Sequence, residues 1–413
     1  MNQNNAQIPE APLFVCEVDD PAVGLRGWLA IHTIGRRGCC GGIRLYPDVT
    51  KEETIALARA MTRKYCICGY SLGGAKAGVQ IPFDVDQNKR ATMLENFGSH
   101  IGPLLKSRIY HPWMDMNCSV DDLRSIYKGA GKQLKFTPAD SGYFTALSTF
   151  SALSAVAEHL DIKPDHCTVT IEGFGGVGSN LALEIARWGG KVIAVSNLRG
   201  TAFNPKGLDV QSLFEKRKQL GDGWIEQQGQ YDLLPREELF SLDTTIHVPC
   251  ARVFSLSIDK AQRLNCKAVV PAANEPCAPG VEHKLFEKGI LPLPYFVVNI
   301  GGITGSGLAA NGANDGQIRR IFTDEFHQMI WRLLKLSEKN HTSPIDIALR
   351  EAAGCYQYLF DSVGPVKTGR RWLSKLGITT RPSPRQKIRE LKITFDSRFS
   401  SPLGDAGIEP ATR

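Results

Sequence analysis

The sequence lacks a long apolar run and an apolar leader. No stretch of about 18 consecutive apolar residues occurs, so we expect no membrane-spanning helix. The opening MNQNNAQIPEAP is polar, so we do not expect a secretory signal. The 413 residues, 42% hydrophobic and 22% charged, have the composition of a soluble globular protein with room for two domains. We therefore expect a cytoplasmic protein.

Cysteine pairs with the spacing of a zinc site or a disulfide framework are also missing. The eleven cysteines are scattered, and none forms a C-x-x-C pair with a distant mate. Free thiols are usual in the cytoplasm, where disulfides are rare. We therefore predict reduced cysteines and no metal site.

Outside one stretch near the end, the chain has almost no excess of positive over negative charge. Residues 366–398 contain ten Lys or Arg and two acidic residues, so the rest of the chain is close to neutral although the net charge is +7. A nucleic-acid-binding segment is one interpretation of this stretch. We favour a solvated helix followed by a loose tail, and we do not expect nucleic acid as a partner.

Alternating strand and helix patterns predict an α/β fold. Residues 25–34 read as a strand, and residues 50–65 read as a helix that begins at Thr50 with a capping-box pattern. Residues 141–160 have the spacing of a long helix. Short β-branched runs, which suit a parallel sheet covered by helices, lie at residues 168–174, 191–197, 244–250, 266–272 and 295–301.

These patterns predict two domains and two smaller C-terminal parts. The last two amphipathic helices have no strand between them, which favours packing back on the first domain. The predicted parts are an N-terminal substrate-binding and oligomerisation domain (1–144), a Rossmann-type NAD(P)-binding domain (145–330), C-terminal helices packing on the first domain (331–376), and a basic tail expected to be disordered (377–413).

A glycine-rich turn between a strand and a helix predicts a dinucleotide site. The turn reads Gly173-Phe174-Gly175-Gly176-Val177-Gly178, a G-x-G-x-x-G. In such a turn the first glycine permits the tight bend, the second lets the backbone approach the pyrophosphate, and the third allows close helix packing. The helix N-terminus then faces the phosphates.

The end of the next strand bears on the choice of cofactor. An NAD site usually has an acidic residue there, which bonds the ribose 2′-OH, whereas this chain has neutral Asn197 and then Arg199. The missing carboxylate and the nearby guanidinium favour NADP(H), with NAD(H) as the open alternative.

Two lysines and an aspartate are the candidates for chemistry. Lys64 and Lys76 lie twelve residues apart, and Lys76 follows a Gly-Gly pair. A partly desolvated lysine has a lowered pKa, which suits it to acid–base work or to polarising a carbonyl. Asp115 lies among apolar residues, where we expect its pKa to rise towards neutrality.

Taken in order, the motifs resemble those of the glutamate/leucine/phenylalanine/valine dehydrogenase family. The resemblance runs from about Asp19 to about Leu334, and the opening DDPAVGLRGWLAIHT is similar to the leucine dehydrogenase branch. The similar segments are GGIRLYPDVT, K-x11-K within GGAKAG, DMN, GFGGVG, AANEP and NIGGITGS.

The resemblance implies an NAD(P)-dependent amino-acid dehydrogenase, which interconverts an L-amino acid with its 2-oxo acid and ammonia. It implies that Lys76 polarises the 2-oxo group and helps activate water, that Lys64 binds the α-carboxylate, and that Asp115 shuttles protons. It also implies a homo-oligomer assembled through the first domain. Further implied contacts are Gly41 and Gly42 at the pocket wall, Asn274 and Asn299 near the nicotinamide, and Ser141 at the start of the helix into the second domain.

Some residues depart from the family pattern at the side-chain pocket. Cys40 stands where glutamate-specific members carry a lysine, and Trp113 stands where a small residue is usual. These changes favour a substrate other than glutamate. Ser306 matches glutamate-specific members, and Arg44 offers a cation, so a glutamate dehydrogenase remains an alternative. The other alternative is a catalytically idle NAD(P)-binding relative that acts as a sensor or partner.

Overall fold

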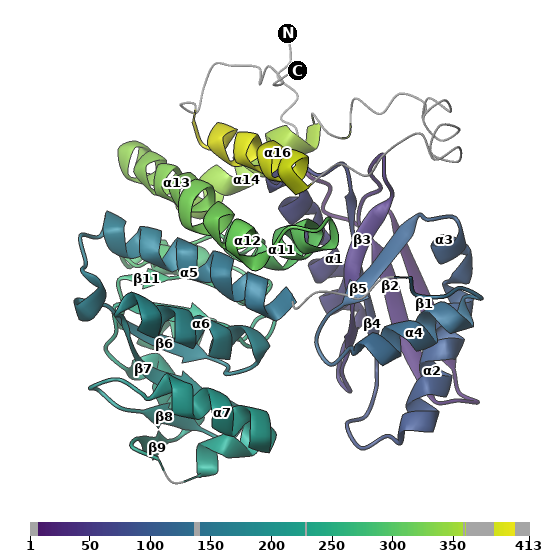
Figure 1. The fold of residues 1–413 in the computed structure, drawn as a ribbon, viewed down its shortest axis with the longest axis horizontal. Helices are drawn as coiled ribbons and strands as arrows, with labels where there is room; N and C mark the ends of the chain where they lie inside the picture. Colours follow the sequence, from purple (N-terminus) through teal and green to yellow (C-terminus); the bar gives the residue numbers. More distant parts are fainter. Residues whose placement is uncertain (1–6, 136–140, 228, 358–359, 361–383, 401–413) are drawn as a thin grey trace. The chain divides into compact units, whose positions relative to one another are not determined.

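The computed structural model shows two compact units, each with its own sheet (Figure 1). The units comprise residues 1–139 with 352–381, and 140–351 with 382–413. The structure describes residues 7–135, 141–227, 229–357, 360 and 384–400. In this part of the chain, no helix is long and apolar enough to cross a membrane.

The first unit contains a five-stranded mixed sheet. Its order is β1-β2-β4-β3-β5; β2 pairs antiparallel with β1 and β4, and β3 pairs parallel with β4 and β5. The strands are β1 (Phe14–Asp20), β2 (Leu25–Ile31), β3 (Cys39–Leu45), β4 (Gly73–Val79) and β5 (Tyr110–Met114). The predicted strand at 25–34 is thus confirmed as β2.

Helices cover the two faces of this sheet differently. They are α1 (Lys51–Ile67), α2 (Gln87–His100), α3 (Gly102–Lys106) and α4 (Val120–Gly129). Ala75, Ala77 and Val79 of β4 enter a hydrophobic core with side chains of α2 and α4. The residues between them turn to the other face, where α1 packs directly on β4. A Cβ atom at Gly74 would lie 2.3 Å from the backbone nitrogen of Thr62 in α1, so only glycine permits this approach.

The second unit contains a seven-stranded sheet of Rossmann type. Its order is β12-β11-β10-β6-β7-β8-β9, and the strands from β12 to β7 run parallel while β8 and β9 are antiparallel additions. The strands are β6 (Thr168–Glu172), β7 (Lys191–Ser196), β8 (Thr201–Phe203), β9 (Asp232–Leu234), β10 (Ile246–Pro249), β11 (Ala268–Val269) and β12 (Leu291–Pro292). The first four predicted β runs are confirmed.

Many helices follow residue 140. The α-helices are α5 (Ser141–His159), α6 (Gly176–Trp188), α7 (Val210–Leu220), α8 (Ile258–Arg263), α9 (Val281–Glu287), α10 (Tyr295–Val298), α11 (Gly301–Ala310), α12 (Asp315–Ile321), α13 (His327–Asn340), α14 (Pro344–Tyr356) and α16 (Pro384–Ser397). Short turns are η1 (Pro164–His166), η2 (Gly221–Glu226) and η3 (Arg236–Ser241), and a π-helical turn, η4 (Phe322–Phe326), joins α12 to α13.

The strand predicted at residues 295–301 is wrong. This segment forms α10, preceded by Pro294 and followed by Asn299. All four residues of α10 are buried, so the apolar run is equally compatible with a buried strand and with a short buried helix. The last strand of the sheet lies earlier, at β12.

The C-terminal helices were predicted to pack on the first domain, and for α13 this prediction is wrong. This helix packs on α5 within the second unit, and residues up to 351 belong to that unit. Its apolar stripe, which includes Ile330, Leu333 and Leu334, is buried there. Residues 361–376 lie outside the described residues.

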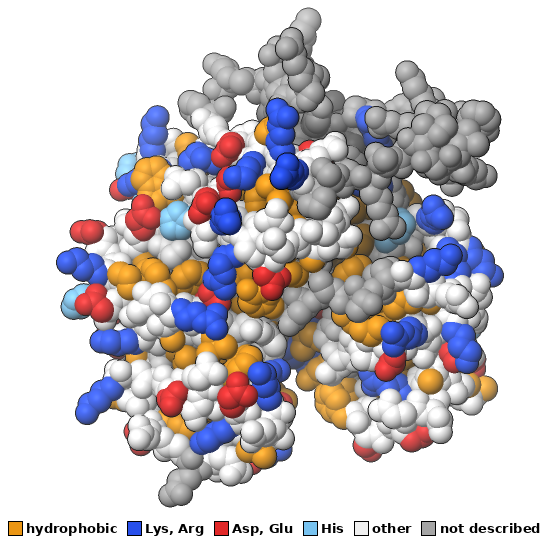
Figure 2. Space-filling model, viewed as in Figure 1, with side chains coloured by type: hydrophobic (Ala, Val, Ile, Leu, Met, Phe, Trp, Pro, Cys, Tyr) orange, Lys and Arg blue, Asp and Glu red, His pale blue; other side chains and the backbone are white. Residues whose placement is uncertain are grey.

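The prediction of a disordered tail is wrong for residues 384–397, which form α16. Leu391 and Phe395 are buried, and the Phe395 ring packs on Phe326 at a centroid distance of 5.6 Å. Apolar residues four apart give this basic segment a core-facing stripe. Two of its lysines are paired as well: Lys387 contacts Glu390, and Lys392 contacts Glu325. On the face drawn in Figure 2, basic and acidic side chains are interspersed.

Candidate active site

One face of the first sheet carries a buried cluster of charged side chains. Lys76 on β4 and Arg44 on β3 both contact Asp115, the residue after β5. The Lys76 Nζ lies 2.8 Å from Asp115 Oδ2, and the Arg44 Nε donates to the same oxygen at 2.9 Å. Arg44 also donates to the Glu53 carboxylate of α1. Charges held this far from water are expected at a functional site rather than on an ordinary surface.

Two glycines of β3 make room for this cluster. A Cβ atom at Gly41 would lie 1.5 Å from the carbonyl oxygen of Ala75 in β4. A Cβ atom at Gly42 would lie 2.8 Å from the Cβ of Asp115. Any side chain at either position would therefore displace β4 or the catalytic candidate Asp115 itself.

The first turn of α1 supplies part of the cluster. Thr50 accepts a hydrogen bond from the Glu53 backbone nitrogen at 3.1 Å, which confirms Thr50 as the N-cap. The Glu53 carboxylate, which the capping-box pattern directs back to the N-cap, contacts Arg44. The same residues therefore start the helix and bring an acidic group to the sheet.

Both lysines have lowered pKa values, as expected. Burial is the main reason that the pKa of Lys64 falls to about 7; the nearby charge of Lys76 lowers it further, and Asp115 opposes the change. Burial also lowers the pKa of Lys76, against the opposing charge of Asp115. The Lys64 amine therefore exchanges protons near neutral pH, which free lysines do not.

The expectation that the pKa of Asp115 rises is wrong. Burial by itself raises this pKa, but the charges and hydrogen bonds of Lys76 and Arg44 outweigh burial and hold it below its usual range. The apolar neighbours in the sequence gave no sign of Arg44, which is 71 positions away. Asp115 is therefore an ionised carboxylate in the free protein.

Cys40 is a partly buried, neutral residue. Cys40 shares a hydrogen bond with Tyr65 of α1, and burial raises the pKa of its thiol, so the thiol stays protonated. Lys76 is close enough to act on this pKa. Trp113 of β5 pairs in register with Gly42, two positions from Cys40. A thiol, a phenol and an indole thus lie where a glutamate-specific site is expected to have a lysine.

The glycine turn of the second unit has the geometry of a pyrophosphate site. Gly173 has φ +99°, and a Cβ atom at Gly178 would lie 2.1 Å from the carbonyl oxygen of Gly173. No atom of the described residues lies within 4 Å of a Cβ added at Gly175, so the backbone there is open to a ligand. Gly175 provides no side-chain cap to α6, which leaves the first N–H groups of that helix for an anion. These residues fit the phosphates of NAD(P).

The end of β7 lies beside this turn, because the Gly173 backbone nitrogen donates to the Ser196 carbonyl at 3.0 Å. The Asn197 side chain is occupied locally: it donates to the Asp222 carbonyl and accepts from the Arg199 backbone nitrogen, both at 2.8 Å. Arg199 forms a half-exposed ion pair with Glu226 of η2. Sequence reasoning missed Glu226, since no local motif marks an acid 27 positions after the arginine.

A third group of candidates in the second unit has unpaired buried polar atoms. The Asn299 amide nitrogen donates to Ala272, Ala273 and Asn274 at 3.0–3.1 Å, which fixes which end of the amide is oxygen. That oxygen and the Ser306 hydroxyl are buried with no hydrogen-bond partner in the described part of the chain. Such atoms are rare in folded proteins and suit a ligand. Ser141 begins α5, and its carbonyl accepts from Thr145.

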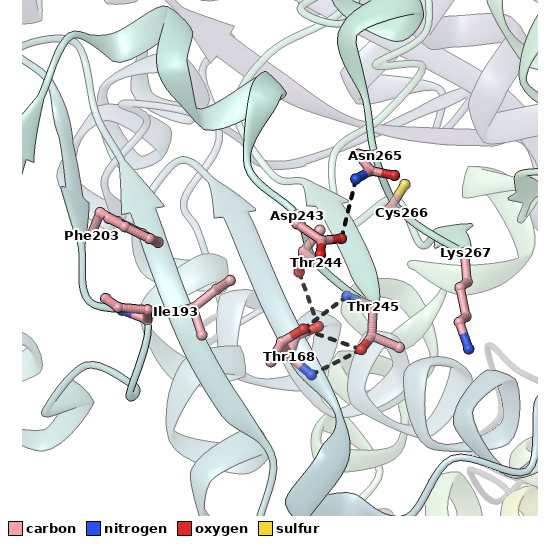
Figure 3. Close-up of a pocket in the computed structure, with 10 residues that line it drawn as sticks. Thr168, Ile193, Phe203, Asp243, Thr244, Thr245, Asn265, Cys266 and Lys267 are labelled. Atoms are coloured by element: carbon pink, nitrogen blue, oxygen red, sulfur yellow. Dashed lines mark hydrogen bonds between the residues drawn. The ribbon is translucent and has the colours of Figure 1, made fainter.

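A cavity of about 520 Å³ in the second unit lies elsewhere (Figure 3). Its lining includes Thr168 at the start of β6 and Thr245 before β10, so it opens at the amino ends of the parallel strands. Ligands of such sheets bind at the carboxyl ends, where the glycine turn is. The Thr168 and Thr245 hydroxyls bond each other at 3.1 Å, so the cavity does not present them to a ligand.

Family comparisons agree with both units. A family model described as "Glutamate/Leucine/Phenylalanine/Valine dehydrogenase" matches residues 140–353. A second, described as "Glu/Leu/Phe/Val dehydrogenase, dimerisation domain", matches residues 14–130. The glutamate dehydrogenase of Thermotoga maritima is 33% identical over 308 residues, which cover 70% of this chain and 74% of that protein.

Solved structures share the fold. The hetero-hexameric glutamate dehydrogenase from Thermus thermophilus matches with a TM-score of 0.73 and 23% identity, covering 86% of this chain and 91% of that one. The L-tryptophan dehydrogenase from Nostoc punctiforme matches with a TM-score of 0.59 and 20% identity, covering 85% and 98%. The chain therefore belongs to the glutamate/leucine/phenylalanine/valine dehydrogenase family of NAD(P)-dependent amino-acid oxidoreductases.

Proposed function

We propose that this protein oxidises an L-amino acid with an uncharged side chain to its 2-oxo acid and ammonia, reversibly. The observation that supports this most is the state of the pocket cations. Cys40 replaces a lysine and bonds Tyr65, while Arg44 is held by Asp115 and Glu53. Arg44 is the other cation that could pair with the side-chain carboxylate of a glutamate substrate, and both of its contacts are already made within the protein. A side-chain carboxylate would enter this cluster without a partner, which costs a few kcal/mol.

Lys64 is the proposed site of the substrate α-carboxylate. Its ammonium is buried, and its pKa of about 7 shows that burial and Lys76 disfavour the charge before substrate arrives. An incoming carboxylate relieves that penalty by ion pairing. Lys64 therefore selects for the α-carboxylate and orients the substrate at the same time.

Asp115 and Lys76 carry the proposed proton steps. Two cations contact Oδ2 of Asp115, so Oδ1 is the oxygen that takes the proton from the substrate amino nitrogen. Bound NAD(P)⁺ supplies the acceptor for the hydride that leaves Cα. Loss of the hydride from Cα and of a proton from the nitrogen leaves an imine. Lys76 helps water add to the imine carbon and polarises the oxo group that forms there when ammonia leaves, so that the 2-oxo acid remains. One water is consumed, and two electrons leave with the hydride.

Other residues are proposed to hold the cofactor and shape the pocket. The glycine turn from Gly173 to Gly178 takes the pyrophosphate, and Asn274 and Asn299 contact the nicotinamide amide. Arg199 favours NADP(H), and the 2′-phosphate would compete with Glu226 for its guanidinium. The remaining assignments are Ser141 to the cofactor, and Gly41, Gly42, Trp113 and Ser306 to the substrate pocket. We further propose a cytoplasmic homo-oligomer assembled through residues 1–144.

Two alternatives make different predictions. A glutamate dehydrogenase is favoured by the buried Ser306 hydroxyl, which has no hydrogen-bond partner among the described residues and suits a carboxylate. An idle NAD(P)-binding relative needs the glycine turn but has no chemical use for Lys64, Lys76 and Asp115 together. The buried cluster that these three residues form is costly to a fold without a function.

A substrate panel tests the proposal. The measurement is kcat/KM for glutamate, leucine, valine, phenylalanine and tryptophan with each cofactor. We expect glutamate to trail the best uncharged substrate by roughly 100-fold, and a Cys40→Lys variant to narrow that gap. A tenfold lead for glutamate would refute the assigned substrate class. Absence of turnover with every amino acid and both cofactors would support the idle relative.

A further inference from the structure

Arg44 connects three parts of the first unit through one planar side chain. It lies on β3, between β4 and β5 in the sheet. Its Nε donates to Asp115 Oδ2 at 2.9 Å, and an NH group donates to the Glu53 carboxylate of α1. Arg44 is 4% exposed, so water does not compete strongly for these bonds. A guanidinium suits this task because its donors point in fixed, separate directions.

The two carboxylate oxygens of Asp115 differ in the number of cations that contact them. Arg44 and Lys76 both reach Oδ2, and no hydrogen bond from the described residues reaches Oδ1. The Asp115 side chain is 17% exposed, more than those of its two cationic partners. One oxygen is therefore fixed from two sides while the other is available.

We propose that Arg44, oriented by Glu53, is a positioning residue that holds Asp115 through Oδ2 so that Oδ1 exchanges the proton of the substrate nitrogen. This inference rests on the proposed roles of Lys76 and Asp115. It adds two residues to the reaction that neither the glycine turn nor the lysine motif indicates. Glu53 acts one step further away, because it contacts Arg44 and fixes its orientation.

The same contacts set the charge balance of the site. Arg44 lowers the pKa of Lys76 and of Asp115, whereas Glu53 raises the pKa of Lys76. Loss of Arg44 therefore raises both pKa values, and loss of the Glu53 charge lowers that of Lys76. Other titratable groups near Lys76 and Asp115 are Cys40 on β3, Lys64 on α1, and Cys118 before α4.

The experiment compares three variants in the full-length protein: Arg44→Gln, Arg44→Lys and Glu53→Gln. Arg124→Gln is the control, since Arg124 on α4 forms an exposed ion pair with Asp121 at 2.5 Å and has no hydrogen bond to a residue of this cluster among the described residues. Two readouts are taken against pH. The first is kcat/KM, and the second is the rate at which acetic anhydride modifies Lys76, followed by peptide mass spectrometry. The second readout needs no turnover.

We expect Arg44→Gln to move the Lys76 titration upward by roughly 1–3 pH units and Glu53→Gln to move it downward. Arg44→Lys keeps the charge but cannot serve two carboxylates in a fixed geometry. Its titration should stay near that of the wild type while kcat falls at least about tenfold. Arg124→Gln should leave both profiles in place.

The outcomes separate this inference from the proposed function. A slower Arg44→Gln variant whose Lys76 titration does not move would show a merely structural role and overturn the inference. Equal kcat in Arg44→Lys and wild type would overturn the positioning role. If Arg44→Gln does not fold, the pH profiles of Arg44→Lys and Glu53→Gln still test the positioning role. Normal turnover of a Lys76→Ala variant would instead refute the proposed function.

Discussion

Replacement of Lys64 by methionine should make the protein more stable and nearly inactive. Lys64 is 4% exposed, and burial is the main cause of its pKa of about 7. A methionine has a similar length without the charge, so it fits the same space without the desolvation cost. A lysine kept for structure alone would show the opposite result, because its loss would only remove contacts.

The magnitude follows from the difference between the folded and unfolded pKa values. The folded value of about 7 lies below the ordinary value of 10.5, so the unfolded chain binds more protons between these two pH values, and stability rises with pH. At pH 7 the lowered pKa of Lys64 reduces the free energy of unfolding by roughly 4 kcal/mol, and about 2 kcal/mol of this loss disappears by pH 9. In Lys64→Met, the free energy of unfolding should not show this rise between pH 7 and pH 9.

The assay is urea denaturation of wild type and variant at pH 7 and pH 9, together with kcat/KM. We expect the variant to gain at least about 1 kcal/mol at pH 7, less at pH 9, and to lose at least about 100-fold in kcat/KM. Lys128→Met is the control, since the Lys128 side chain is 73% exposed and pairs with Glu95. Its stability should change little at either pH.

A destabilised Lys64→Met variant, or a gain that does not shrink at higher pH, would refute this reasoning. Unchanged kcat/KM would separately refute the assignment of Lys64 to the α-carboxylate.

Further predictions concern the chemistry, the cofactor and the C-terminal helix. Lys76→Ala and Asp115→Asn should each lower kcat at least about 100-fold while isothermal titration still detects NAD(P) binding; near-normal turnover in either would contradict their roles. Arg199→Ala should lower the ratio of kcat/KM for NADP⁺ to that for NAD⁺, and Glu226→Gln should raise it; an NAD⁺ preference unchanged by Arg199→Ala would exclude Arg199 as the reader of the 2′-phosphate. Phe395→Ala should cost about 3–5 kcal/mol of unfolding free energy in urea, because its ring is fully buried, whereas a negligible loss would show that α16 is not docked.

The sequence indicated the parts of the fold that depend on local rules. The glycine turn from Gly173 to Gly178 lies between β6 and α6 as predicted, because turn, strand and helix preferences coincide within a dozen residues. Thr50 starts α1 for an equally local reason. Buried short segments were less certain: α10 has the apolar composition of a strand, and only its surroundings decide its conformation.

The sequence also identified the charged candidate residues, but it did not predict the protonation state of each one. Lys64 and Lys76 were recognised, and the effect of burial on their pKa values was foreseen. For Asp115 the local apolar neighbours suggested a raised pKa, whereas Arg44 lowers it from another strand. Burial is readable from local composition, but the partner that compensates for it is not.

Sequence alone therefore indicated the family of this protein, the glycine turn between β6 and α6, and the candidate residues for its chemistry. Tertiary structure decided what each charged group meets: Arg44 with Asp115 and Glu53, Arg199 with Glu226, and the basic stretch of α16 with the second unit. The physical reason is range. Turn and helix preferences act over a few residues, whereas a buried charge depends on which distant segments the sheet brings together.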